Sequence, residues 1–280
     1  MVDLYVHANP DLIPRHSDDL ELSVVLKAAG FAKAVHRHHF TSTAERGRIA
    51  QEVTGFPLLG AVLLNESVGG LNPAAVHVAL EMGAVWVGMA TLSAAHYRSR
   101  PSTLLPDRRR AMTFDRGTER VLDDQGRLRP VVNEILDLVA ARGAVLNYGY
   151  LGFEECVALQ AAAVRHGVRK RVMSNPENVI GLTSTQVDAL LQEPGTVLEV
   201  TAYSMYPDRL GGPQGSPDDR AALIRRVGVE RCVLSSDGGN AGTPTPPELL
   251  RWAWAALEQR GFSAAELTAL VRDNPARLLS

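Results

Sequence analysis

Short hydrophobic runs, several of them rich in β-branched residues, alternate along the chain with longer amphipathic segments. Runs of the first kind are typical of buried parallel strands, and segments of the second kind are typical of helices packed on a sheet. Eight runs predict strands, at residues 4–7, 32–38, 57–65, 84–90, 144–150, 170–175, 196–201 and 231–237. Helices are predicted between them, including residues 44–53, 73–82, 131–142, 154–166, 184–191 and 218–227.

Eight strand–helix repeats favour an α/β fold of the closed (β/α)8 TIM-barrel type. An open doubly wound sheet is disfavoured because no glycine-rich phosphate-binding loop follows any predicted strand. The 280 residues contain no internal repeat or Pro/Ser-rich linker, so we expect one barrel domain spanning residues 1–280. Near the end of the chain, Ser263 is expected to cap a helix and Asn274-Pro275 to open the last one.

Residues 99–129 interrupt this rhythm with a long segment that is basic at residues 108–110 and turn-rich at residues 123–126. The segment follows the fourth predicted strand, on the face where barrels carry their active sites. It is interpreted as an inserted lid, and a solvated surface excursion is the equally weighted alternative.

Composition narrows the classes of partner. Hydrophobic residues make up 45% of the chain and charged residues 21%, and the formal net charge is −2. This balance gives no reason to expect nucleic acid or a membrane surface as a partner. Two cysteines without CxxC spacing and the lack of a signal-like or membrane-spanning segment lead us to expect a cytoplasmic protein.

Polar side chains cluster where the predicted strands end. In a barrel those ends converge on one rim, where they would form a polar pocket for a small-molecule substrate. Each of them also has an ordinary structural interpretation, such as a packed histidine or a turn. The residues are Tyr5, His7, His36, His38, His39, Asn65, Tyr148, Tyr150, Asn175, Tyr203 and Asp237.

The motifs in which these residues stand resemble the amidohydrolase superfamily, in particular small barrels that open with a segment like Asp-x-His-x-His-Ala-x-Pro-Asp. Residues 3–11 read Asp-Leu-Tyr-Val-His-Ala-Asn-Pro-Asp. The resemblance continues through Leu64-Asn65, residues 69–73, residues 174–177, residues 235–237 and the closing residues 274–279. Each motif is weak alone, and their order and spacing make the match moderately specific.

In that superfamily a metal is typically held by two histidines on the first strand, by histidines ending the fifth and sixth strands, and by an aspartate ending the eighth. The resemblance places Tyr5 at the first of these positions, Tyr150 at the fifth-strand position and Asn175 at the sixth. It therefore implies that only His7 and Asp237 survive from the ligand set, and no metal cofactor is expected. The alternative is one divalent metal ion held by His7, Asp237 and a histidine of the second strand, either His36 or His38.

Three functions follow from this interpretation. The first is a metal-independent enzyme for cyclisation, dehydration, isomerisation or a lyase step. The second is a mononuclear metal-dependent hydrolase of C–N or C–O bonds, and the third is a non-catalytic small-molecule binding protein. A homodimer is compatible with a barrel of this class.

For the first of these functions, the metal-independent enzyme, the polar residues are expected to take two kinds of role. Proton transfer and charge stabilisation are assigned to Asp237, His7, His36, His38 and Tyr150. Substrate contact is assigned to the remaining positions, which are Tyr5, His39, Asn65, Tyr148, Asn175 and Tyr203.

Overall fold

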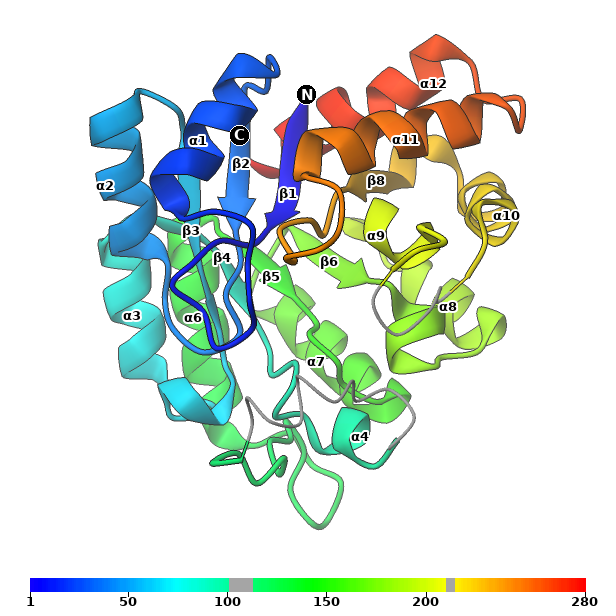
Figure 1. Ribbon diagram of the computed structural model, residues 1–280. Helices are drawn as coiled ribbons and strands as arrows, with labels where there is room; N and C mark the ends of the chain where they lie inside the picture. The colour runs from blue at the N-terminus through cyan, green and yellow to red at the C-terminus, as the bar shows by residue number, and fades with distance from the viewer. Residues whose placement is uncertain (101–112, 210–214) are drawn as a thin grey trace.

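The computed structural model describes residues 1–100, 113–209 and 215–280. Its eight parallel strands lie side by side in chain order and are surrounded by helices, which confirms the predicted (β/α)8 barrel (Figure 1). The strands are β1 (Val2–Val6), β2 (Lys33–His36), β3 (Leu58–Leu63), β4 (Ala84–Gly88), β5 (Val145–Asn147), β6 (Arg171–Ser174), β7 (Thr196–Thr201) and β8 (Cys232–Ser235).

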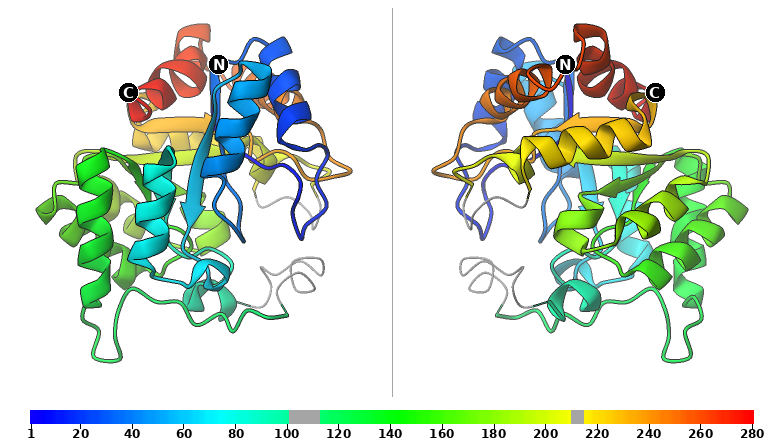
Figure 2. Two further views of the ribbon diagram at one scale, coloured as in Figure 1. Left: turned by 90° about the vertical axis from the view of Figure 1, so that its left-hand side faces the viewer. Right: turned by 90° about the vertical axis from the view of Figure 1, so that its right-hand side faces the viewer.

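The helices pack around the outside of the strands (Figure 2). Six of them match the predicted segments, whereas α1, α4, α9 and α11 were not among those segments. Ser263 caps α12, and α13 begins at Asn274, as expected. The α-helices are α1 (Asp19–Ala28), α2 (Ala44–Thr54), α3 (Pro73–Glu81), α4 (Ala95–Arg98), α6 (Pro130–Arg142), α7 (Phe153–Arg165), α8 (Ser184–Leu191), α9 (Ala202–Met205), α10 (Pro217–Val227), α11 (Pro246–Glu258), α12 (Ala264–Thr268) and α13 (Asn274–Leu278).

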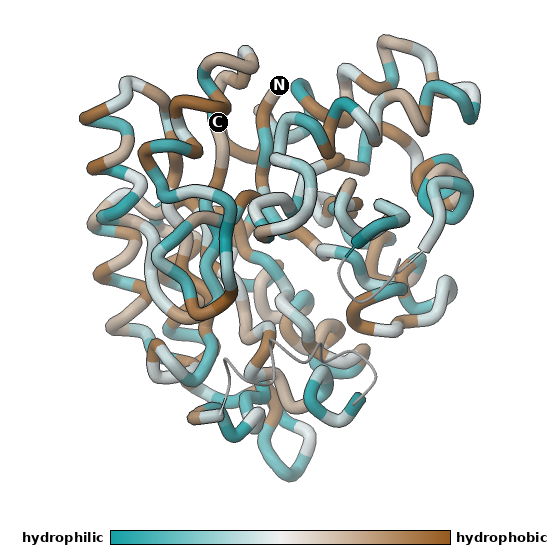
Figure 3. Tube along the Cα trace, in the orientation of Figure 1, coloured by the Kyte–Doolittle hydropathy of each residue, from teal (hydrophilic) through white to brown (hydrophobic). Residues whose placement is uncertain are grey.

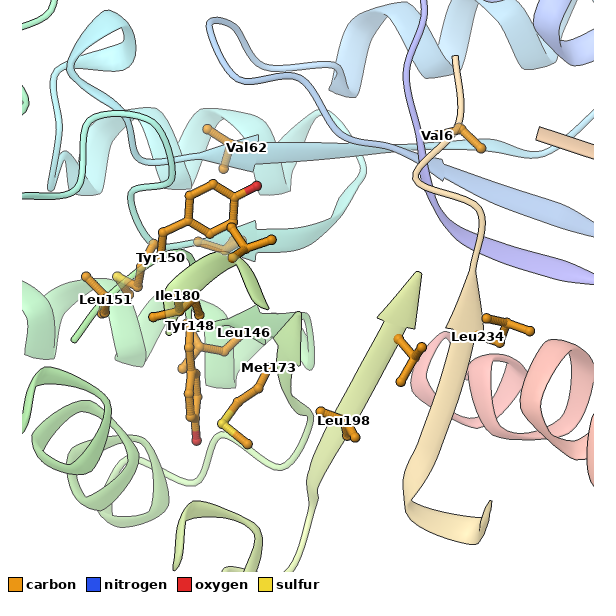
Figure 4. Packing of buried hydrophobic residues seen from close by; sticks show 14 of the residues in the cluster. Val6, Val62, Leu146, Tyr148, Tyr150, Leu151, Met173, Ile180, Leu198 and Leu234 are labelled. Carbon is orange, nitrogen blue, oxygen red and sulfur yellow. The ribbon is translucent and has the colours of Figure 1, made fainter. Parts of the chain in front are cut away.

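Two apolar layers hold the barrel together. One fills the space between strands and helices, where Leu146, Met173 and Leu198 pack outward (Figure 4). The other fills the barrel interior with side chains from seven strands and with Leu278. Because successive strand residues point to opposite faces, each strand contributes to both layers. Hydrophobic segments accordingly run through the middle of the molecule in Figure 3.

The junction between β1 and β8 differs from the other strand pairs. Each of the other seven neighbouring pairs forms a parallel ladder, whereas β1 and β8 are joined by an isolated bridge between Val6 and Gly238. A side chain supplies further bonds here, since Asp3 Oδ1 accepts hydrogen bonds from the backbone N–H groups of Tyr5 and Ser236. The barrel is therefore closed partly by a buried carboxyl group.

Two expectations concern particular segments. No helix within the described residues has the length and hydrophobicity needed to cross a bilayer. The predicted lid falls partly outside the described residues, which include none of its basic residues 108–110. The described part of it is joined to the chain before α4 by a bridge between Glu119 and Ala94, and a second bridge, between Leu122 and Leu128, lies within the segment. Lid motion stays a prediction.

Candidate active site at the barrel mouth

His7 and Asp237 meet where β1 and β8 end. The Nε2 atom of His7 lies 3.3 Å from Oδ1 of Asp237. The other ring nitrogen, Nδ1, lies 2.6 Å from the carbonyl oxygen of Arg37, and because a carbonyl can only accept, Nδ1 must carry a proton. Nε2 and the carboxylate then face each other as two acceptors unless one proton lies between them. The geometry defines a pair that can share one proton.

Burial sets the charge of this pair and its access to solvent. The His7 side chain is 3% exposed, and its pKa lies well below the ordinary value because of burial, with a smaller contribution from nearby Arg15. The Asp237 side chain is 18% exposed, so it is the member that a substrate can reach. Asp237 also has a φ of 52°, a left-handed conformation uncommon outside glycine that frequently accompanies functional sites.

Two phenol groups flank the pair. The ring of Tyr5 lies 5.1 Å from the ring of His7, and its hydroxyl hydrogen-bonds with that of Tyr150. The pKa of Tyr5 is raised well above its ordinary value, first by burial and then by the neighbouring Tyr150 and Asp237. Tyr5 therefore remains a neutral phenol that can donate a hydrogen bond to developing negative charge.

His39 reaches the same place from the loop after β2. Its ring lies 5.4 Å from that of His7, and its Nδ1 lies 2.9 Å from the hydroxyl of Thr91. Asn65 holds this loop by donating to the His39 carbonyl and to the Thr91 hydroxyl, and its Oδ1 accepts from Thr91 and Ser93. These four hydrogen bonds make Asn65 a positioning residue for His39, not the substrate contact that the sequence suggested.

Beneath the pair lies a buried ion pair that the sequence analysis missed. Both terminal nitrogens of Arg37 donate to Glu199, at 2.8 and 2.7 Å. The guanidinium is stacked between two rings, with Cζ 4.0 Å from the centre of Tyr5 and 3.6 Å from that of Trp86. Such bidentate and stacked contacts hold a guanidinium rigidly. Arg37 thus braces Tyr5 from below.

Three further polar side chains fix Glu199. Ser174 and Ser235 donate to its carboxylate, and Asn147 donates to Ser174. They lie on β5, β6 and β8, so the network spans the barrel interior. A signal for it was present in the sequence, because Glu199 is a charged residue inside an otherwise apolar strand and needs a partner of opposite charge.

The structure corrects the expected places of His36 and His38. Val35 and Arg37 face the barrel interior, so the alternation of strand residues turns His36 and His38 toward the helices and loops. His36 Nδ1 lies 2.7 Å from Asp19 of α1. His38 Nδ1 accepts from the backbone N–H groups at residues 40 and 41, and Nε2 lies 3.1 Å from the carbonyl of residue 10. Neither ring joins His7 and Asp237.

The remaining predicted residues fall into different surroundings. Tyr148 points away from the mouth and donates to Gln160 of α7, while Tyr150 points to the other side, as Figure 4 shows. Asn175 hydrogen-bonds with Thr201, which uses both ends of its amide. Tyr203 is buried at the start of α9, and its backbone N–H donates to Ser236. Of the residues predicted at the rim, the structure therefore brings together the following five: Tyr5, His7, His39, Tyr150 and Asp237.

A metal centre of the kind that the resemblance implies does not fit these residues. The inward-facing side chains at the ends of β5 and β6 are Asn147 and Ser174, and both are engaged in the Glu199 network. No group of three or more His, Cys, Asp or Glu side chains suited to a metal ion occurs in the part of the chain that the structure describes. The triad proposed with His36 is not formed, because that ring faces Asp19.

The fold is a (β/α)8 barrel, and comparison with solved structures confirms it. A probable 2-pyrone-4,6-dicarboxylic acid hydrolase from Acinetobacter baumannii, crystallised with citric acid, superposes with a TM-score of 0.61 at 13% identity, over 99% of this chain and 98% of that one. An amidohydrolase from Pseudomonas aeruginosa gives 0.56 at 12%, over 99% and 94%. A mutant organophosphorus hydrolase from Deinococcus radiodurans gives 0.55 at 14%, over 99% and 93%.

The chain belongs to the family of unknown function DUF6282, whose model matches residues 1–199. No curated protein matches the sequence. The matched region contains strands β1 to β6, the first part of β7 and the residues Tyr5, His7, Arg37, Tyr150 and Glu199. Asp237 lies beyond it.

Proposed function

We propose that this protein is an enzyme that moves a proton on a small carbonyl compound without a metal ion. The observation that carries the proposal is the His7–Asp237 pair, which can share one proton and presents Asp237 to the barrel mouth. Such a pair suits an isomerisation, dehydration, cyclisation or lyase step, because each of these needs a proton removed and returned.

Each group at the mouth has a distinct part in this step. Asp237, as a carboxylate, takes a proton from the substrate carbon and later returns it, and His7 shares that proton through Nε2, held in one tautomer by the Arg37 carbonyl. As the proton leaves carbon, negative charge develops on the carbonyl oxygen of the substrate. Tyr5 and Tyr150 stabilise that charge by hydrogen bonding, since the Tyr5 phenol stays neutral. His39 beside His7 is placed to contact the substrate.

The substrate class rests on the site and on the fold. Lactonases and a hydrolase of a pyrone dicarboxylic acid share this barrel, so small lactones and carboxylated carbonyl compounds are the first substrates to test. Among the described residues, the mouth offers phenols and a pair that can share a proton in place of a set of metal ligands. We therefore propose proton transfer at carbon and not attack by metal-bound water.

Exchange of hydrogen for deuterium tests the proposal before the natural substrate is known. The protein is incubated in D2O with a panel of small lactones and keto acids, and NMR follows loss of the C–H signal next to the carbonyl. We expect exchange with at least one compound that is insensitive to a chelator. Asp237→Asn should abolish it, and His7→Gln should slow it by roughly 10²–10⁴-fold, the usual contribution of a positioned acid or base.

The matched control is Asp123→Asn, which removes a carboxylate from an exposed turn and should leave exchange unchanged. Circular dichroism and thermal melts of each variant separate loss of chemistry from loss of fold. Stoichiometric bound zinc, manganese or iron, together with activity that a chelator removes, would identify a metal hydrolase and refute the proposal. Tight binding of a panel compound with no exchange in any would identify a binding protein instead.

A further inference from the structure

Helices α1, α2 and α3 carry an unusual share of exposed apolar side chains on their outer face. This face is turned to the viewer in the left panel of Figure 2. Within the described residues, seven of the eleven exposed large hydrophobic side chains lie on these three neighbouring helices or at the end of α3. They are Leu20, Val24, Val25, Ile49, Val53, Val78 and Met82.

The spacing of these residues makes a continuous surface, here called the α1–α3 face. On each helix two of them are four positions apart, so they stand one above the other on the same side. Ile49 and Val53 on α2 are 58% and 66% exposed. Figure 3 shows the corresponding hydrophobic turns along the outer edge of α2 and α3. Single exposed apolar residues are ordinary, but a connected set on three adjacent helices is typical of an interaction surface.

Charged side chains lie on the same face. Arg48 and Glu52 form an exposed ion pair on α2, with side chains 72% and 65% exposed. Together with Met82 they line a groove of about 290 Å³ between α2 and α3. One helix thus offers a positive group, a negative group and two apolar groups within about one turn and a half.

This pattern is complementary to itself. If α2 packs against a second α2 in antiparallel orientation, with a two-fold axis near Gln51, Ile49 lies opposite Val53 of the partner subunit. Since the helix rises about 1.5 Å per residue, Arg48 then lies within about 3 Å, measured along the axis, of Glu52 of the partner subunit. The reciprocal pair forms by symmetry, as in any isologous interface.

We infer that the α1–α3 face is the interface of a two-fold homodimer, with α2 packed antiparallel against α2 of a second copy. The apolar pairs of α1 and α3 extend the contact on both sides of α2. This inference is independent of the chemistry at the barrel mouth, because the face lies on the outside of the helices.

Analytical ultracentrifugation of the full chain at micromolar concentration tests the inference. The wild-type protein should sediment at twice the 30.2 kDa chain mass. Ile49→Glu should give a monomer, since it places a charge at the centre of the apolar contact. The matched control is Val157→Glu on α7, which changes a residue that is also exposed, at 45%, and should remain a dimer.

Charge reversal tests the orientation of the two helices. Arg48→Glu and Glu52→Arg should each raise the dimer dissociation constant by about tenfold or more, and the double variant should restore it, because the symmetric pairs reform with reversed sign. A wild-type monomer, a dimer of Ile49→Glu or a monomer of Val157→Glu would overturn the interface. A double variant as weak as the single ones would overturn the antiparallel α2 pairing.

Discussion

Asp3 is a buried carboxyl group whose surroundings disfavour its ionised form. Its Oδ1 accepts hydrogen bonds from backbone N–H groups at 3.1 and 3.0 Å, whereas Oδ2 is buried without a hydrogen-bond partner. Burial raises the pKa of Asp3 from 3.8 to about 7, more than the hydrogen bonds to Ser236 and Tyr5 lower it. The folded protein therefore binds a proton at Asp3 that the unfolded chain has already lost at pH 5.

The stability of the Asp3→Asn variant relative to wild type should consequently increase as the pH rises. A carboxyl whose folded pKa is raised contributes most stability below pH 4 and loses it as the pH rises through 7. Relative to wild type, the variant should gain roughly 4 kcal/mol in free energy of unfolding between pH 4 and pH 8, since the amide keeps an acceptor and carries no charge. Urea unfolding at several pH values measures this, and a pH-independent difference would contradict it.

At the level of single residues, sequence predicted the positions of functional groups better than their directions. Tyr5, His7 and Asp237 were found because motif and strand end coincide. His36 was misplaced because a run of three histidines surrounding an arginine does not show which of the four residues faces inward. Only the contact of Arg37 with Glu199, 162 positions away, decides it. Such distant pairing is invisible to local patterns.

At the scale of the elements, the turn after β5 places Tyr150 at the mouth. In this turn the backbone at Gly149 lies close to the backbone at Ala90. Gly149 has a φ of 61°, and a Cβ there would overlap the Ala90 carbonyl oxygen. That carbonyl also accepts from the Tyr150 N–H at 2.9 Å. Only glycine satisfies both the conformation and the contact.

Gly149→Ala should therefore destabilise the protein far more than an unfavourable φ alone. We expect a loss of about 3 kcal/mol or more in free energy of unfolding, because overlap with backbone cannot be relieved by a rotamer change. The matched control is Gly126→Ala, at a φ of 73° with no atom within 4 Å of the added Cβ, which should cost about 1 kcal/mol. Equal losses in urea unfolding would show that crowding at Gly149 is unimportant.

The interior network links β2 to β7 through two charges that depend on each other. Arg37→Met should lower the free energy of unfolding by about 3–5 kcal/mol, because it leaves Glu199 as an uncompensated buried charge. Glu199→Gln should have a similar effect, because it leaves the Arg37 guanidinium buried without a counter-charge. The combined variant removes both charges and should cost clearly less than the two losses added together. A double-mutant cycle measures this coupling, and strictly additive losses would contradict a direct interaction.

For the whole molecule, the barrel was predictable and its closure was not. Strand boundaries agreed within a few residues because eight apolar runs recur with helical segments between them. The weak junction of β1 and β8, the use of Asp3 to bridge it and the charged network in the interior all depend on contacts between distant strands. Tertiary contacts also explain why His36 and Tyr148 lie outside the predicted site, since His36 contacts Asp19 and Tyr148 contacts Gln160.

The stability of the whole molecule in mild acid combines these buried groups. Burial lowers the pKa of His36 and that of His38, the latter to about 4, so the His38 ring is neutral in the fold above pH 5. A histidine with a lowered folded pKa stabilises the protein above pH 6.5 and loses that contribution as the pH falls toward the folded pKa.

Between pH 5 and 6 the unfolded chain should therefore bind a proton at His38 that the fold does not, whereas the fold binds one at Asp3 that the unfolded chain has lost. Relative to wild type, Asp3→Asn should steepen the loss of stability on acidification by roughly 1.4 kcal/mol per pH unit, and His38→Gln should reduce it by about the same amount. His77→Gln, which changes an exposed ring on α3, should leave the slope unchanged. Urea unfolding midpoints across this range provide the slopes, and an unchanged slope in His38→Gln would show that its ring is already charged in the folded protein.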